Sequence, residues 1–242
     1  MIGCIRVNEK LENYKLFDFS GERKNTLITE GSLINSKEQG YFKFYEYDKI
    51  ISEGEFNNGL RTGVWKYYGR DSFFVNWERY NYPSSKININ YPDELEVIDR
   101  EATLFFAKPQ QDTSMNNYFI VLSHTMDSVQ LSVNEYVKLF YNTMTSTTSV
   151  ESYIAYKIEN ENREFYHFEY AIRKEGQLSL MLSLITHQDN QILDFTYVTK
   201  YDDRIKDKTI FFQMITSCYI NNERILSPMK DLEVESITIE SI

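Results

Sequence analysis

The sequence predicts an α+β protein in which a sheet of β-hairpins precedes an α/β/α sandwich with one antiparallel sheet. Three observations favour this class. A pattern of glycine, lysine and aromatic residues recurs after 23 residues in the first third of the chain. Short apolar or alternating segments, typical of strands, fill most of the remainder. Two longer segments, which begin at Ser132 and Asp202, show the spacing of amphipathic helices instead.

The repeat predicts stacked hairpins. Glu30-Gly31 recurs as Glu53-Gly54, and the segment GYFKFY at 40–45 recurs as GVWKYY at 63–68. Asn57-Asn58-Gly59 favours a tight turn, because asparagine and glycine tolerate positive φ. One hairpin cannot bury its own apolar face, so we expect the copies to pack side by side in a sheet.

A module boundary is expected after residue 81. Residues 1–81 hold 12 Lys and Arg and 12 Asp and Glu, a net charge of zero, whereas residues 82–242 hold 14 and 24, a net charge of −10. The stretch 81–85, with its proline and two serines, is the best linker. We therefore expect a hairpin module at 1–81, an α+β domain at 82–222, and an edge strand or acidic tail at 223–242.

Strand and helix signals alternate in the second module. Ser132 and Glu135 form a capping box that starts the first helix. The second helix is expected at 202–217, with a buried stripe of Ile205, Ile210, Phe211, Met214 and Ile215. The expected strands are 87–91, 102–107, 118–124, 152–159, 164–173, 178–187 and 191–199.

Composition and charge exclude several classes. Hydrophobic residues make up 42% and charged residues 26%, as in folded proteins, and the aromatic content of 15% favours β-structure. The net charge of −10 argues against nucleic-acid binding and would attract a basic partner. Cys4 and Cys218 form no Cys-x-x-Cys motif, and neither a signal peptide nor a membrane span is readable. These features predict a cytoplasmic protein that does not bind membranes.

No motif predicts catalysis. His124, His167 and His187 are isolated in expected strands, so neither a metal site nor another cofactor site is predicted. No nucleophile elbow and no glycine-rich phosphate loop occurs. We therefore expect no catalytic residues, no cofactor and no enzyme activity. The alternative is an enzyme with a dispersed site, assembled from His124, His167 and Asp194.

The aromatic residues of the first module are the candidate binding residues. Aromatic side chains anchor many protein interfaces, and the expected anchors are Trp65, Tyr67, Phe73 and Trp77. The alternative is that these side chains form the core between neighbouring hairpins. The two alternatives stay open at this stage.

The first half resembles MORN-type repeats in the variant common in bacteria. Residues 53–68 match its pattern of Glu-Gly-x-aromatic, an Asn-Gly turn and Gly-x-Trp-x-Tyr-Tyr, and residues 30–45 match less fully. The resemblance implies a hairpin sheet. Bacterial members of that family often look like antitoxin or immunity components, and others are scaffolds.

The second half resembles the fold shared by photosystem II subunit P and the Ran-binding Mog protein. The segment 87–97, with its Tyr-Pro and following acidic residue, resembles the opening of that group, and 201–217 resembles its closing helix. This implies an α/β/α sandwich, and some bacterial relatives look like adaptors for type VI secretion effectors.

Together these patterns predict a non-catalytic bacterial protein that binds a toxin or secreted effector, as its immunity protein or as an adaptor or chaperone. The alternatives are the enzyme with a dispersed site and a structural scaffold. The oligomeric state stays undetermined.

Overall fold

The computed structural model divides the chain into two compact units. The first comprises residues 1–81 and 88–93, and the second comprises 82–87 and 94–242. The structure describes residues 3–4, 12–18, 26–35, 37–46, 49–68, 72–82, 87–111, 117–126, 131–147, 149–160, 163–174, 176–201, 204–226 and 233–238. Residues 83–85 of the expected linker, the side chain of Ile205 and parts of the expected tail lie outside these described residues.

The first unit is a sheet in which the strands follow one another in chain order. Each of the pairs from β1–β2 to β6–β7 is antiparallel, and β8 neighbours β7. Residues 88–93, which include most of β8, therefore belong with the hairpins. The strands are β1 (Gly3–Cys4), β2 (Glu12–Asp18), β3 (Thr26–Ile34), β4 (Lys37–Glu46), β5 (Lys49–Asn57), β6 (Leu60–Tyr67), β7 (Phe73–Tyr82) and β8 (Ile87–Pro92).

The second unit is built on an antiparallel sheet with the order β18-β12-β13-β14-β15-β11-β10-β9. The long strands β12 to β15 are joined as consecutive hairpins. The strands of this sheet are β9 (Leu95–Val97), β10 (Phe105–Pro109), β11 (Tyr118–Thr125), β12 (Ser149–Asn160), β13 (Arg163–Lys174), β14 (Gln177–Gln188), β15 (Gln191–Lys200) and β18 (Glu233–Ser236). The residues of the second unit also form a small hairpin of β16 (Tyr219–Ile220) and β17 (Glu223–Arg224).

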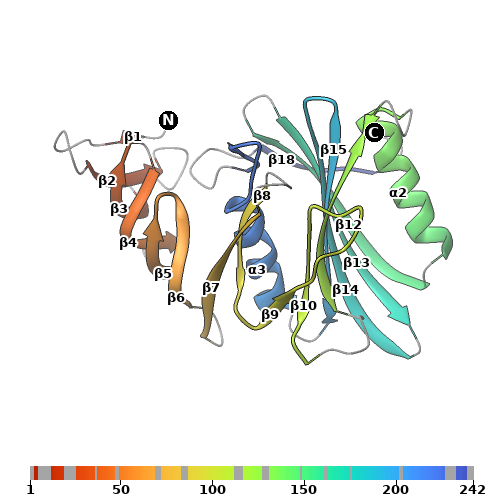
Figure 1. Cartoon of the computed structure of the whole chain (residues 1–242), viewed down its shortest axis with the longest axis horizontal. Helices are drawn as coiled ribbons and strands as arrows, with labels where there is room; N and C mark the ends of the chain where they lie inside the picture. Colours follow the sequence, from red (N-terminus) through yellow and green to blue (C-terminus); the bar gives the residue numbers. More distant parts are fainter. Residues whose placement is uncertain are drawn as a thin grey trace. The chain divides into compact units, whose positions relative to one another are not determined.

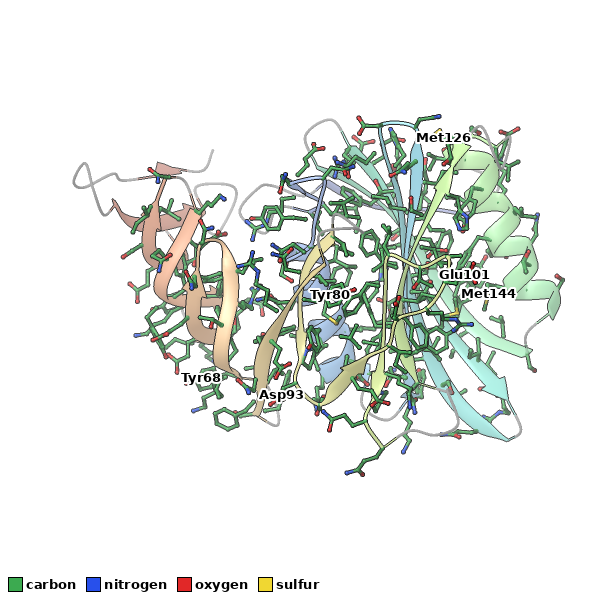
Figure 2. The ribbon with its side chains drawn as sticks, in the orientation of Figure 1. Tyr68, Tyr80, Asp93, Glu101, Met126 and Met144 are labelled. Atoms are coloured by element: carbon green, nitrogen blue, oxygen red, sulfur yellow. The ribbon has the colours of Figure 1, made fainter. Side chains whose placement is uncertain are left out.

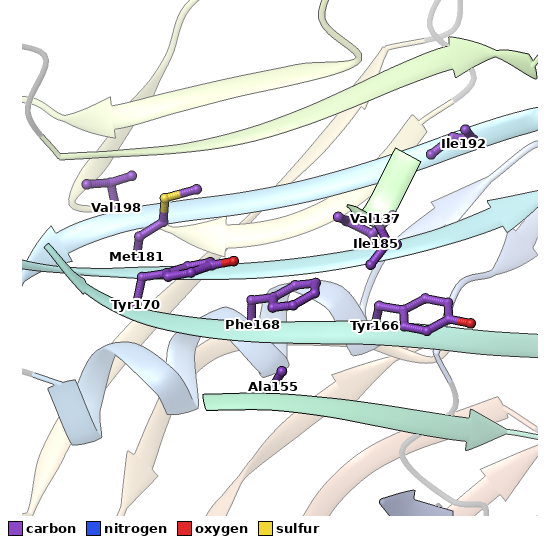
Figure 3. Close-up of a cluster of buried hydrophobic side chains, with 9 residues drawn as sticks. All are labelled: Val137, Ala155, Tyr166, Phe168, Tyr170, Met181, Ile185, Ile192 and Val198. Carbon is purple, nitrogen blue, oxygen red and sulfur yellow. The ribbon is translucent and has the colours of Figure 1, made fainter. Parts of the chain in front are cut away.

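Helices α2 (Val133–Thr147) and α3 (Arg204–Thr216) pack on opposite faces of this sheet (Figure 1). On β13, Phe168 belongs to the cluster that includes Val137 of α2 (Figure 3), whereas the ring of the preceding His167 lies 6.0 Å from that of Phe211 in α3. Successive strand side chains point to opposite faces, so each helix covers its own face.

The capping box that starts α2 and the buried apolar stripe of α3 are both present, as the sequence predicts. Glu135 Oε2 accepts a hydrogen bond from the Ser132 backbone N–H at 2.8 Å, and the Glu135 N–H donates to Ser132 Oγ at 3.3 Å. This reciprocal pairing satisfies N–H groups that a helix start leaves open. In α3 the described part of the predicted stripe is buried, namely Ile210, Phe211, Met214 and Ile215.

Of the local predictions, one is corrected, one strand was missed, and one open alternative is decided. The strand expected at 102–107 begins at Phe105, because Ala102 has a φ of 63° and the Thr103 N–H donates to the Arg100 carbonyl in a turn. Strand β9 was not expected, since three residues are too few to show a period. Within 223–242, the segment Glu233–Ser236 is an edge strand, because it pairs with β12.

Candidate functional site

In each copy of the repeat in the first unit, one aromatic ring packs across a glycine of the neighbouring strand. A Cβ built on Gly54 would lie 2.4 Å from the Trp65 ring, and one built on Gly31 would lie 2.5 Å from the Phe42 ring. Both rings are fully buried. Neither glycine has a positive φ, so glycine is required here for space and not for backbone freedom.

The expected aromatic anchors lie in this buried layer. Trp65, Tyr67 and Trp77 are 0%, 3% and 4% exposed, and the half-buried Phe73 stacks on Tyr67 with ring centroids 5.0 Å apart. Trp65 Nε1 donates to the Glu55 carbonyl, and Trp77 Nε1 donates to the Tyr67 hydroxyl. These rings therefore pack against each other, and a partner that docks on this unit would meet other side chains.

The other face of the same strands carries a row of alternating charges, which we call the charge ladder. Glu30 of β3 pairs with Lys43 of β4, Lys43 with Glu53 of β5, Glu53 with Lys66 of β6, and Lys66 with Phe74 of β7. Opposite charges on facing residues stabilise a sheet. We call the face that bears the ladder the outer face.

Tyrosines hold the ladder carboxylates in place. Tyr45 donates a hydrogen bond to Glu30 at 2.5 Å, and Tyr68, labelled in Figure 2, donates to Glu53 in the equivalent position of the next copy. The bonds from Tyr68 and Tyr41, together with Lys43 and Lys66, outweigh partial burial and lower the pKa of Glu53. Glu53 is therefore a fixed negative charge at neutral pH.

Apolar side chains stand exposed beside this ladder. Val64 and Phe74 are each 62% exposed and Tyr41 is 53% exposed. Lys66 Nζ lies 4.4 Å from the Tyr68 ring centroid and 5.8 Å from that of Phe74, which are cation–π distances. The outer face thus combines exposed apolar groups with charges that already have partners.

These outer-face residues were missed from the sequence, although a signal was present. Because side chains alternate along a strand, the burial of Trp65 and Tyr67 places Val64 and Lys66 on the opposite face. The glycine eleven residues before Trp65 marks the ring that turns inward.

The second unit has a buried polar cluster beneath α2. Asp194 of β15 is 3% exposed, and its carboxylate accepts hydrogen bonds from Thr196 at 2.9 Å, Tyr136 at 3.1 Å and Ser183 at 3.4 Å. Burial raises the pKa of Asp194, although these donors and the nearby His124 oppose the shift. The cluster links the sheet to α2 through the Tyr136 hydroxyl.

The three residues of the dispersed-site alternative do not share one location. Ile192 and Asp194 lie on the same face of β15, and His124 pairs with Ile192, so His124 and Asp194 share the α2 face. The His124 ring lies 5.4 Å from that of Tyr136. His167, in contrast, packs against Phe211 and Phe212 on the α3 face. The structure therefore brings two of the three residues together.

On the α3 face, His167 belongs to an ion-pair network. Its Nε2 lies 3.3 Å from Glu169 Oε1 and its Nδ1 lies 2.9 Å from the Ser183 carbonyl oxygen, while Lys208 of α3 pairs with Glu169 Oε2. Burial raises the pKa of Glu169, but the bonds from His167 and Lys208 outweigh it and lower that pKa overall. In the described part of the chain, no group of three His, Cys, Asp or Glu could hold a metal ion.

This network predicts an acid-dependent loss of stability. A carboxyl with a lowered folded-state pKa stabilises the protein above its unfolded pKa and stops doing so as the pH falls through the folded value. Glu169→Gln is expected to cost about 1–2 kcal/mol at pH 7 and less at pH 3. Urea unfolding of both proteins at the two pH values measures this, and an equal difference at both would contradict it.

The comparisons with known proteins give similarity of fold only. No family model and no curated protein matches the chain. Among solved structures, it is similar to cyanobacterial PsbP (CyanoP) from Synechocystis, with 12% identity and a TM-score of 0.47 over 63% of this chain and 96% of that one. LpqN of Mycobacterium tuberculosis, involved in cell envelope biogenesis, is 7% identical with a TM-score of 0.38 over 60% and 90%.

A protein of unknown function from Pseudomonas aeruginosa is 11% identical, with a TM-score of 0.36 over 57% of this chain and 92% of that one. Every one of these TM-scores is below 0.5, so the similarities carry no inference about what the chain binds or catalyses. No helix in the described residues is long and apolar enough to span a membrane.

Proposed function

We propose that this chain is a non-catalytic bacterial protein-binding protein, which acts in the cytoplasm as an immunity protein, or as an adaptor or chaperone, for a toxin or secreted effector. The observation that carries this proposal is the outer face, where Tyr41, Val64 and Phe74 are exposed beside the charge ladder. Apolar groups gathered on one face mark interaction sites, whereas single exposed ones do not.

Rigidity of this face favours binding. Tyr68 and Lys66 are held by Glu53 and by ring contacts, so docking a partner would order few additional side chains. Ordering an exposed side chain costs about 0.5–1.5 kcal/mol, and a face ordered in advance avoids that cost. The apolar groups would be desolvated at the centre of the interface and the charges would set the orientation.

We also propose that the first unit is a MORN-type sheet and that the second is an α/β/α sandwich like that of subunit P and Mog. The equivalence of Gly31 with Gly54 and of Glu30–Tyr45 with Glu53–Tyr68 supports the first assignment. The placement of α2 and α3 on opposite faces supports the second. Folds do not fix function, so the binding role rests on the outer face.

Val64→Glu is the sharpest test of this role. A charge at the centre of the exposed apolar group is expected to weaken capture of a stoichiometric partner from the host at least tenfold. The measurement is affinity capture with the tagged full chain, quantified by mass spectrometry. Leu139→Glu is the matched control, because Leu139 is 51% exposed on α2 of the second unit. Equal capture by both variants would reject the outer face as the binding site.

A dispersed-site enzyme is a second candidate function, favoured by the shared face of His124 and Asp194 beneath α2. An activity of the purified chain that His124→Gln abolishes and His167→Gln preserves would support it, because only His124 shares the Asp194 face. If both His124→Gln and His167→Gln retain the activity of the unsubstituted chain, this candidate is rejected.

A further inference from the structure

A second row of outer-face residues runs beside the charge ladder. Tyr41 of β4 pairs with Glu55 of β5, and Val64 of β6 pairs with Asn76 of β7. The Asn76 side-chain amide donates to Asp93 Oδ2 at 2.8 Å, which places Asp93 (Figure 2), just after β8, at the end of this row. Glu55 pairs in turn with Thr62 of β6, two residues from Val64. Val64, the most exposed aliphatic residue among the described side chains of this unit, therefore lies on a strand between those that place Glu55 and Asp93.

The outer face is locally negative around Val64, although residues 1–81 as a whole are neutral. Glu78, whose carboxylate accepts from Tyr91, adds a further negative charge near Asp93. Arg79 alternates with Glu78 and therefore points to the other side of β7. The register also places Lys15 on this face, opposite Glu30, so the ladder itself alternates in sign. The excess of negative charge lies around Val64, where Glu55, Glu78 and Asp93 stand against Lys66.

The distance between Glu55 and Asp93 limits which peptide conformations could contact both carboxylates. Glu55 and Asp93 are on or beside strands that stand three steps apart, which corresponds to about 14 Å at the usual strand spacing. In an extended chain, residues i and i+4 are also about 14 Å apart, and residue i+2 points the same way. An extended segment laid across the strands would thus place two side chains over the carboxylates and a third above β6 and β7, which carry Val64 and Asn76.

Resting on the proposed function, we infer that the outer face receives an extended basic segment of the partner, with a basic–x–apolar–x–basic pattern. The basic side chains pair with Glu55 and Asp93, and the apolar side chain covers Val64 between them. Phe74 on β7 and Tyr41, opposite Glu55 on β4, add exposed apolar surface on the same face.

Selection of a random twelve-residue peptide library on the immobilised full chain tests this inference. We expect enrichment of peptides with two Lys or Arg four positions apart around an apolar residue. Their affinity, measured by fluorescence anisotropy, should fall about tenfold or more in Glu55→Gln/Asp93→Asn. Asp99→Asn/Glu101→Gln, which removes two exposed carboxylates from the second unit, should leave it unchanged.

The outcomes separate this inference from the proposed function. Peptides that bind both double variants equally, or a selection that returns no common pattern, would overturn the inference. Enriched peptides that are acidic or uncharged, and that Val64→Glu still blocks, would also overturn it while preserving the outer face as the docking surface. Basic peptides that bind independently of both Val64 and Glu55 would overturn both.

Discussion

Gly54→Ala is expected to lower the free energy of unfolding of the first unit by about 3 kcal/mol or more. The added Cβ would lie 2.4 Å from the Trp65 ring. That ring cannot move aside, because it is fully buried, its centroid lies 5.0 Å from that of Phe56, and its Nε1 donates to the Glu55 carbonyl. Since the chain's two tryptophans, Trp65 and Trp77, are both in this unit, urea unfolding followed by tryptophan fluorescence reports on it alone.

Two further variants isolate the cause of this loss. Glu55→Ala changes the next position on the exposed side of the same strand and should cost about 0.5 kcal/mol or less. In a Trp65→Leu background the ring is absent, so adding Gly54→Ala should cost less than about 1 kcal/mol. A penalty for Gly54→Ala that is as large without the ring as with it would show that the glycine serves another purpose.

Local rules predicted much of the fold. The capping box at Ser132 and the apolar stripe of the last helix depend on neighbours within a few residues, and both are present. The hairpin β14–β15 likewise follows from two alternating segments around a short turn. The start of β10 could not be predicted in this way, because the positive φ of Ala102 depends on the surrounding chain and not on its own side-chain type.

The candidate site was harder to predict, because it depends on which strand face turns inward. Aromatic residues occur on both faces: Trp65 and Trp77 are buried, whereas Tyr41 and Phe74 are exposed. Residue type alone therefore could not distinguish the buried aromatic residues from the exposed ones. The charge ladder requires the register between strands, and the bulges that separate paired residues in β3–β4 and β5–β6 set that register without a signal in composition.

Asp194→Asn is expected to stabilise the second unit at alkaline pH. Burial raises the pKa of Asp194 in the folded state. A carboxyl with a raised folded-state pKa favours folding below its unfolded pKa of about 4, and that contribution is lost as the pH rises through the folded value. Asparagine resembles the protonated acid, since Oδ1 still accepts from Thr196 and the amide can donate to the Tyr136 oxygen.

The free energy of unfolding, measured by urea titration with circular dichroism, should therefore be about 1–3 kcal/mol higher in Asp194→Asn than in the unsubstituted chain at pH 8, and nearly equal at pH 3.5. Asp189→Asn removes the same charge from the exposed turn between β14 and β15 and should show no such pH-dependent gain. Tyr136→Phe should destabilise the protein, because it removes a hydroxyl that donates to the Asp194 carboxyl. An Asp194→Asn variant that is less stable by the same amount at both pH values would mean that the buried carboxylate is ionised and fully compensated by its three donors.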